Sequence, residues 1–186
     1  MKRTNQRREN EESQISEADY IIHAAEVCIM DLTGFLSHIR GISEKLGTHI
    51  ICLNADIIAG RAHAELAIKL AARSFFRDKE PISNSFEMEV LLYAGGTRQC
   101  ADAGHFGIHE GINRIYICIY PKNNEAIELL KQYVKFTKND VNQLEEEKYN
   151  RLVSQFEISD EELQVVGHDH LFDLVLERVA LLDVNK

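Results

Sequence analysis

The sequence predicts an α+β fold: a single domain in which a small mixed sheet of three or four short strands packs against several helices. Strand-like runs rich in β-branched residues alternate with helical patterns along the chain. Hydrophobic residues make up 45% of the 186 residues and charged residues 27%, which is a globular balance. Residues 1–18 are polar and charged, so we expect a disordered basic tail there and one domain over residues 19–186.

The first half of the domain carries clear start and stop signals. Thr33 can cap a helix, and Gly47 can end it, because glycine accepts the left-handed backbone found after helices. We expect, in chain order, a strand at 25–31, a helix from Thr33 to about Lys45, a strand at 48–54 and a long helix from Arg61 to about Arg77.

The second half begins with a turn at 81–85, which ends in a capping serine, Ser83 or Ser85. The run FEMEVLLYA fits a strand or a helix; we choose a helix because Gly95 and Gly96 resemble a helix end and Thr97 a new start. Further along we expect a short helix closed by Gly107, a strand at 112–121, and helices at 123–136, 140–156, 159–166 with a Ser159–Glu162 capping box, and 169–183.

The charge distribution limits the choice of partners. The net charge of −9 argues against nucleic acid when taken alone, since phosphate contacts need Lys and Arg. The segment 57–79, however, has five basic and two acidic residues, while 138–186 has five basic and twelve acidic residues. A local basic surface can coexist with an acidic protein. No apolar run approaches the roughly 20 residues needed to span a bilayer, so we expect a cytoplasmic protein with no membrane partner.

A basic ridge is predicted on the long helix, where charged residues recur every four positions: Arg61, Glu65, Lys69, Arg73 and Arg77. In a purely structural interpretation, the ridge is a solvent-exposed edge of the helix with weak ion pairs. As a functional alternative, Arg61, Lys69 and Arg73 bind a phosphate backbone. The spacing leaves both open.

The Gly95–Gly96–Thr97 turn is a second candidate. Amides at the start of the next helix can hold a phosphate, and Arg98 can pair with it or stack on a base. Gln99 offers a donor and an acceptor to a base edge, and Tyr93 offers a stacking face. An ordinary turn between helices remains the alternative. His63 lies among alanines and is more often a satisfied core histidine than a functional one.

No residue pattern makes a positive case for catalysis, a metal site or a cofactor. His105 and His109 have helical spacing, but Gly107 lies between them and no third ligand is in view. No phosphate-binding loop, nucleophile elbow or HExxH motif is present. The single cysteines Cys28, Cys52, Cys100 and Cys118 are expected to be reduced, with three of them packed in strands.

Several positions between 54 and 108 together resemble one protein family. They are Asn54, Ala55, Asp56, His63, Asn84, Ser85, Met88, Glu89, Ala94, Gly96, Arg98, Gln99, Gly107 and Ile108. This pattern resembles the TPRKB family, the small kinase-binding subunits of the KEOPS (EKC) tRNA-modification complex, in its archaeal type. The segment 174–184 also resembles the family's final helix. Cys100 and Gly104 depart from the family's aliphatic pattern, which predicts a shorter helix after Thr97.

The resemblance implies a non-catalytic subunit that binds a RIO-like kinase. It also implies binding of the single-stranded 3′ CCA end of tRNA, which would support threonylcarbamoyladenosine (t6A) formation at tRNA position 37 by the threonylcarbamoyltransferase assembly. We therefore assign backbone phosphates to Arg61, Lys69 and Arg73, and the terminal nucleotides to Asn84, Arg98 and Gln99, with Tyr93 or His63 stacking. One alternative is a protein-only kinase regulator, with the acidic C-terminal helices as its kinase-binding candidates; another is a small-molecule-binding enzyme subunit that uses the Gly95–Gly96 loop.

Overall fold

The computed structural model describes residues 19–138 and 145–184. Its sheet has the strand order β2-β3-β1-β4, and its strands are β1 (Ile21–Ile29), β2 (His49–Asn54), β3 (Gly111–Tyr120) and β4 (Lys135–Phe136). The α+β class is confirmed, but the sheet is antiparallel rather than mixed. The physical reason lies in β3, which pairs antiparallel with both β1 and β2 and so separates two strands that run in the same direction.

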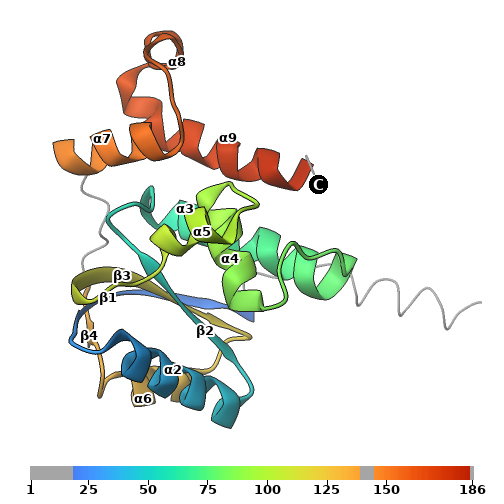
Figure 1. The fold of residues 1–186 in the computed structure, drawn as a ribbon, viewed down its shortest axis with the longest axis vertical. Helices are drawn as coiled ribbons and strands as arrows, with labels where there is room; N and C mark the ends of the chain where they lie inside the picture. The colour runs from blue at the N-terminus through green and yellow to red at the C-terminus, as the bar shows by residue number, and fades with distance from the viewer. Residues whose placement is uncertain (1–18, 139–144, 185–186) are drawn as a thin grey trace, which may run out of the picture.

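Helices cover both faces of the sheet (Figure 1). On one face lie α2 (Leu32–Leu46) and α6 (Asn124–Leu130); on the other lie α3 (Gly60–Ala72) and α4 (Phe86–Gly95). Side chains alternate across a strand, so Ile50 and Cys52 pack in the core beneath α2, whereas Ile51 and Leu53 pack beneath α3 and α4. The strands therefore read as almost continuous apolar runs.

The local signals place most boundaries correctly. Gly47 ends α2 in the left-handed conformation, with φ of 61°, as expected. The cap at the start of that helix is Asp31 rather than Thr33, because the Asp31 carboxylate accepts a hydrogen bond from the Gly34 amide at 3.0 Å. The first strand starts at Ile21, earlier than expected, since it pairs with β3 along its whole length.

The long helix and its successor follow the prediction with one change of geometry. After Ala72 the helix continues as a π-helical segment, Arg73–Asp78. Ser85 caps α4 through the Met88 amide, and Gly96 ends it with φ of 58°, which confirms the helix over the strand. Thr97 does not cap the next helix, because that helix begins at Cys100 with Gln99 at the cap position, and the Thr97 hydroxyl accepts from the amide of Gln99 itself.

The helix after the turn is short, as Cys100 and Gly104 predict. It consists of α5 (Cys100–Ala103) and a 3₁₀ turn, Gly104–Phe106. The helix expected at 123–136 ends at Leu130 instead. The chain turns there because Lys135 and Phe136 pair with the edge of β1, and a sheet edge offers partners that a helix end lacks.

The last three helices lie beyond α3 and α4, and α9 packs against both of them (Figure 1). They are α7 (Glu146–Gln155), α8 (Asp160–Val166) and α9 (Leu171–Val184), and the Ser159–Glu162 capping box is confirmed. The expected start at residue 140 and the tail at 1–18 lie outside the described residues. Within the described ranges, no helix has the length and apolar character that a membrane span requires.

Candidate functional site

The basic ridge of α3 lies against the start of β1. The Arg61 guanidinium donates from Nε to Glu65 at 2.9 Å and from Nη1 to the Ile22 carbonyl at 3.0 Å. The Lys69 ammonium lies 5.7 Å from the centre of the Tyr20 ring. Both cations are therefore held on the side of α3 that faces β1.

Arg73 lies elsewhere, beside the end of α9. It forms an ion pair with Asp183, and its Nε is 3.8 Å from the Asp78 carboxylate. Each step of four residues turns about 40° around a helix, so Arg61 and Arg73 differ in direction by roughly 120°. The structure thus places Arg61 and Lys69 on the same side of α3 but Arg73 against a different element.

Tyr93 cannot stack on a base, so that prediction was wrong. Its side chain is 0% exposed, and its hydroxyl donates to Asp183 Oδ1 at 2.8 Å. The ring is buried because α9 covers this part of α4. Asp183, on the last of the acidic C-terminal helices, thus contacts two of the residues assigned to RNA, Tyr93 and Arg73.

His63 is also unavailable for stacking. It is 0% exposed; its Nδ1 accepts from the Ala59 amide at 3.0 Å, and its Nε2 donates to the Ala94 carbonyl at 2.8 Å. Burial lowers the pKa of His63 to about 4, so the ring stays neutral near pH 7. His63 is therefore a core histidine with both ring nitrogens hydrogen-bonded. Its two bonds join the start of α3 to the end of α4.

The turn between α4 and α5 carries exposed polar side chains. Arg98 and Gln99 are both exposed, and so is Cys100. A Cβ atom added at Gly96 would lie 3.5 Å from the Arg178 carbonyl of α9, so this turn is packed closely against that helix. The close packing fixes the position on the surface from which Arg98 and Gln99 project into solvent.

Asn84 lies at the opposite end of α4 from Arg98. The helix has ten residues, which separates its two ends by about 15 Å. Asn84 is exposed in a loop that a buried carboxylate organises: Glu89 accepts from the Ser83 amide at 2.8 Å and from the Ser74 hydroxyl at 2.9 Å. Asn84 precedes α4, whereas Arg98 and Gln99 follow it, so the three residues flank one helix and do not converge on one point.

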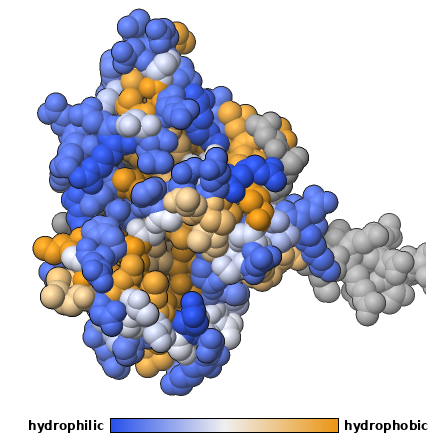
Figure 2. All heavy atoms as spheres, viewed as in Figure 1, coloured by the Kyte–Doolittle hydropathy of each residue, from blue (hydrophilic) through white to orange (hydrophobic). Residues whose placement is uncertain are grey.

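A groove of about 800 Å³, which the sequence did not indicate, opens between α2 and α4 (Figure 2). Strand β2 lies along it, with His49 to Cys52 among the lining residues. The walls come from both helices and from the segment after α5, and include Leu36, Ile39, Arg40, Leu91, Gly104, Gly107 and Ile108. The groove is mostly apolar, and charged groups stand among its lining residues.

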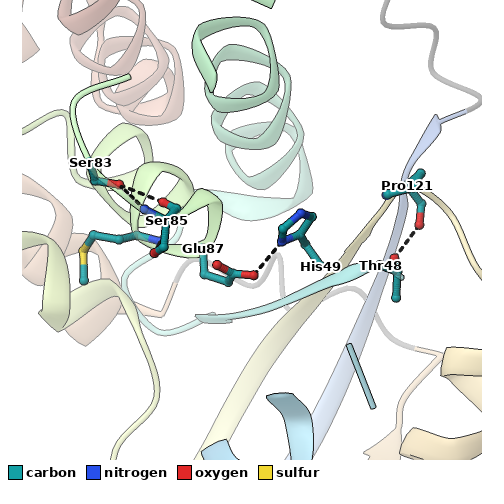
Figure 3. A network of polar contacts seen from close by, with 7 residues as sticks. Thr48, His49, Ser83, Ser85, Glu87 and Pro121 are labelled. Atoms are coloured by element: carbon teal, nitrogen blue, oxygen red, sulfur yellow. Dashed lines mark hydrogen bonds and ion pairs between the residues drawn. The ribbon is translucent and has the colours of Figure 1, made fainter. Parts of the chain in front are cut away.

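A polar pair joins β2 to α4 within this groove (Figure 3). The Nδ1 of His49 donates to Glu87 Oε1 at 2.7 Å. The His49 ring also lies 5.0 Å from the ring of Phe86, measured between centroids. The hydrogen bond from His49 lowers the pKa of Glu87, which is half-buried. The pair holds the first turn of α4 against the sheet.

The described residues contain no group of three or more His, Cys, Asp or Glu side chains that could hold a metal ion. All four cysteines are free; Cys52 and Cys118 are buried, whereas Cys28 and Cys100 are exposed. Cys28 is therefore not packed in the core as expected, although it lies in β1. Burial raises the pKa of Cys52 to about 12, which keeps that thiol neutral.

Comparisons with known proteins agree with this architecture. The regulatory protein Cgi121 of Methanocaldococcus jannaschii is 29% identical over 148 residues, which cover 76% of this chain and 88% of that protein. The family model of the kinase-binding protein CGI-121 matches residues 34–183, from α2 to the end of α9. Because this match spans most of the sheet and every helix of the described fold, the chain belongs to the CGI-121 family of kinase-binding proteins.

Proposed function

We propose that this chain is a non-catalytic regulatory subunit that binds a RIO-like kinase within a KEOPS assembly and captures the single-stranded 3′ CCA end of tRNA. In this role it supports t6A formation at position 37 of tRNA by the threonylcarbamoyltransferase subunit. The kinase partner rests on the family, whose members are described as kinase-binding proteins. The RNA role rests on exposed side chains in the loops at the two ends of α4.

The observation that carries the RNA role is the exposure of Arg98 and Gln99 on a closely packed turn. An exposed guanidinium can pair with a phosphate, and an exposed side-chain amide can read a base edge. Asn84, about 15 Å away at the other end of α4, supplies a second polar contact for a strand that runs along the helix. Arg61 and Lys69 remain the candidates for phosphates further along the RNA.

A protein-only kinase regulator is the second candidate, and the ridge favours it. Arg61 and Arg73 already pair with Glu65 and Asp183, so a phosphate would compete with carboxylates for both guanidinium groups. Tyr93 and His63 are buried and supply no stacking face. In this second candidate function, the protein binds the kinase but does not bind RNA.

A gel-shift titration separates the two candidates. Intact tRNA should bind more tightly than the same tRNA without its CCA end, and Arg98→Glu should weaken only the binding of intact tRNA. The matched control is Lys131→Glu, which makes the same charge change just after α6, across the sheet. Binding of the kinase, measured by calorimetry, should survive both substitutions.

The salt dependence gives an independent readout. For single-stranded RNA the slope of log K against log salt falls by about 0.7 for each phosphate contact removed, so Arg98→Glu should reduce it by about that amount. Equal affinity for the two tRNAs would refute capture of the 3′ end. No binding of either tRNA at low salt, with kinase binding intact, would establish the protein-only candidate.

A further inference from the structure

Strand β2 is an edge strand at the floor of the groove. In the part of the chain that the structure describes, it pairs with β3 on one side and with no strand on the other. The groove runs along the unpaired side from Gly47 to Cys52. An edge strand offers backbone groups to another strand unless the protein covers them.

The register identifies which backbone groups point into the groove. The Ala55 amide donates to the carbonyl of Arg114, the residue directly opposite in the continued β2–β3 register, at 2.9 Å. Directly opposed residues alternate between hydrogen-bonded and non-hydrogen-bonded pairs in an antiparallel ladder. Leu53, Ile51 and His49 therefore bond to β3, whereas the N–H and C=O groups of Ile50 and Cys52 point outward.

The neighbouring outward groups agree with this assignment. The Thr48 amide donates to the Ser43 carbonyl at 3.1 Å, and the Asn54 carbonyl accepts from the Ile57 amide at 3.2 Å. These two hydrogen bonds satisfy outward-pointing backbone groups at the two ends of the β2 edge. Between them, Ile50 and Cys52 present two donor–acceptor pairs two residues apart, which is the repeat of an extended chain.

We propose that this groove binds an extended segment of a partner protein, which adds to the sheet as a strand beside β2. Strand β2 has six residues and spans about 20 Å, enough for a segment of about six residues. Main-chain hydrogen bonds to Ile50 and Cys52 hold the segment, and the two helices select its side chains.

The groove walls define the chemistry of the segment. Its alternate side chains face α2 and α4 in turn, since a strand alternates its faces. Leu36 and Ile39 line the α2 wall, and Leu91 and Ile108 line the opposite wall. The groove takes apolar side chains on both faces, and a segment without excess charge suits lining residues that include Arg40 and Glu87.

The recessed edge argues against a second copy of this chain as the occupant. Two such edges would each lie at the bottom of a groove, between α2 and α4 of their own molecule. The helices would meet before the strands came within the roughly 4.8 Å that pairing requires. A single extended segment enters without that obstruction.

Gly104 provides a way to fill the groove without disturbing the fold. It lines the groove, is exposed, has an ordinary helical φ of −56°, and has no atom within 4 Å of where a Cβ atom would lie. Gly104→Leu should therefore fold normally and place a side chain in the groove. Gly41→Leu is the matched control, because Gly41 also has open space around it but lies on α2 outside the groove lining.

The test uses a fluorescein-labelled hexapeptide of alternating valine and threonine, measured by fluorescence anisotropy. The Kd should rise about tenfold or more with Gly104→Leu and stay unchanged with Gly41→Leu. N-methylation of the peptide tests the strand geometry, because alternate amides of a strand point to opposite sides. Methylating either the three valines or the three threonines should weaken binding about tenfold, and methylating the other set should not.

Other results would overturn the proposal. An equal loss with both methylated peptides would show that no strand forms, and the absence of saturable binding at millimolar peptide would show that the groove takes no such segment. Self-association that Gly104→Leu abolishes, in place of peptide binding, would assign the groove to a second copy. None of these results depends on tRNA binding.

Discussion

Asp183, near the end of α9, accepts a hydrogen bond at 2.8 Å from the hydroxyl of Tyr93 on α4. The same carboxylate pairs with Arg73, at the junction of α3 and its π-helical extension. One side chain thus ties three helices together. Two residues that sequence patterns assigned to RNA instead hold α9 in place.

Asp183→Ala should destabilise the protein by about 2 kcal/mol, because it leaves the buried Tyr93 hydroxyl without its acceptor and Arg73 without a partner on α9. Urea unfolding followed by circular dichroism measures the change. Asp173→Ala is the control: its exposed pair with His170 should contribute less than about 0.5 kcal/mol. Equal effects of the two substitutions would contradict a special role for Asp183.

Glu89→Gln should also be costly. Its carboxylate is 0% exposed and accepts from the Ser74 hydroxyl and from the amides of Ile82 and Ser83. A glutamine turns an NH₂ group toward some of these donors, so we expect a loss of about 2–4 kcal/mol. Thermal unfolding provides the measurement, with the exposed Glu128→Gln as the matched control. A loss below that of the control would refute the assignment.

The buried His63 predicts a stability that falls in mild acid. Its pKa is about 4 in the folded protein and about 6.5 when unfolded, so the unfolded chain binds the extra proton between these values. Stability from this group is present above pH 6.5 and declines as the pH falls towards 4, by about 3 kcal/mol in total.

Unfolding of the wild type and of His63→Gln at pH values from 4.5 to about 7 tests this slope. Glutamine can accept from Ala59 and donate to Ala94 without titrating. The difference in free energy of unfolding between the two proteins should shrink as the pH falls. A difference that stays constant across this range would remove His63 from the acid sensitivity.

Gly96→Ala should cost about 1 kcal/mol, because the left-handed φ of 58° strains any residue with a Cβ atom. Gly41→Ala serves as the control and should instead stabilise α2 by up to about 1 kcal/mol, since that glycine is helical and unobstructed. Denaturant midpoints compare the two proteins. A neutral Gly96→Ala would show that the turn before Arg98 is not fixed by its backbone conformation.

Several features follow from residues close together in the sequence. The Ser159–Glu162 capping box, the Ser85 cap and the Gly47 helix end need only their own neighbours, so short-range patterns identify them. The apolar run of β3 likewise indicates its own burial, which is continuous from Ile115 to Ile119. The helix at 86–95 could be distinguished from a strand by the two glycines that follow it.

Other features depend on partners distant in the sequence. Tyr93 and Asp183 are 90 residues apart, and Arg73 and Asp183 are 110 apart, so no local pattern reveals that α9 buries one residue and pairs with the other. The two-residue β4 exists only because β1 has an edge to pair with. The sequence by itself determined the class of fold, most helix and strand positions and the family; only the tertiary structure decided which polar residues remain accessible and where a groove opens, because both depend on how the separate elements pack.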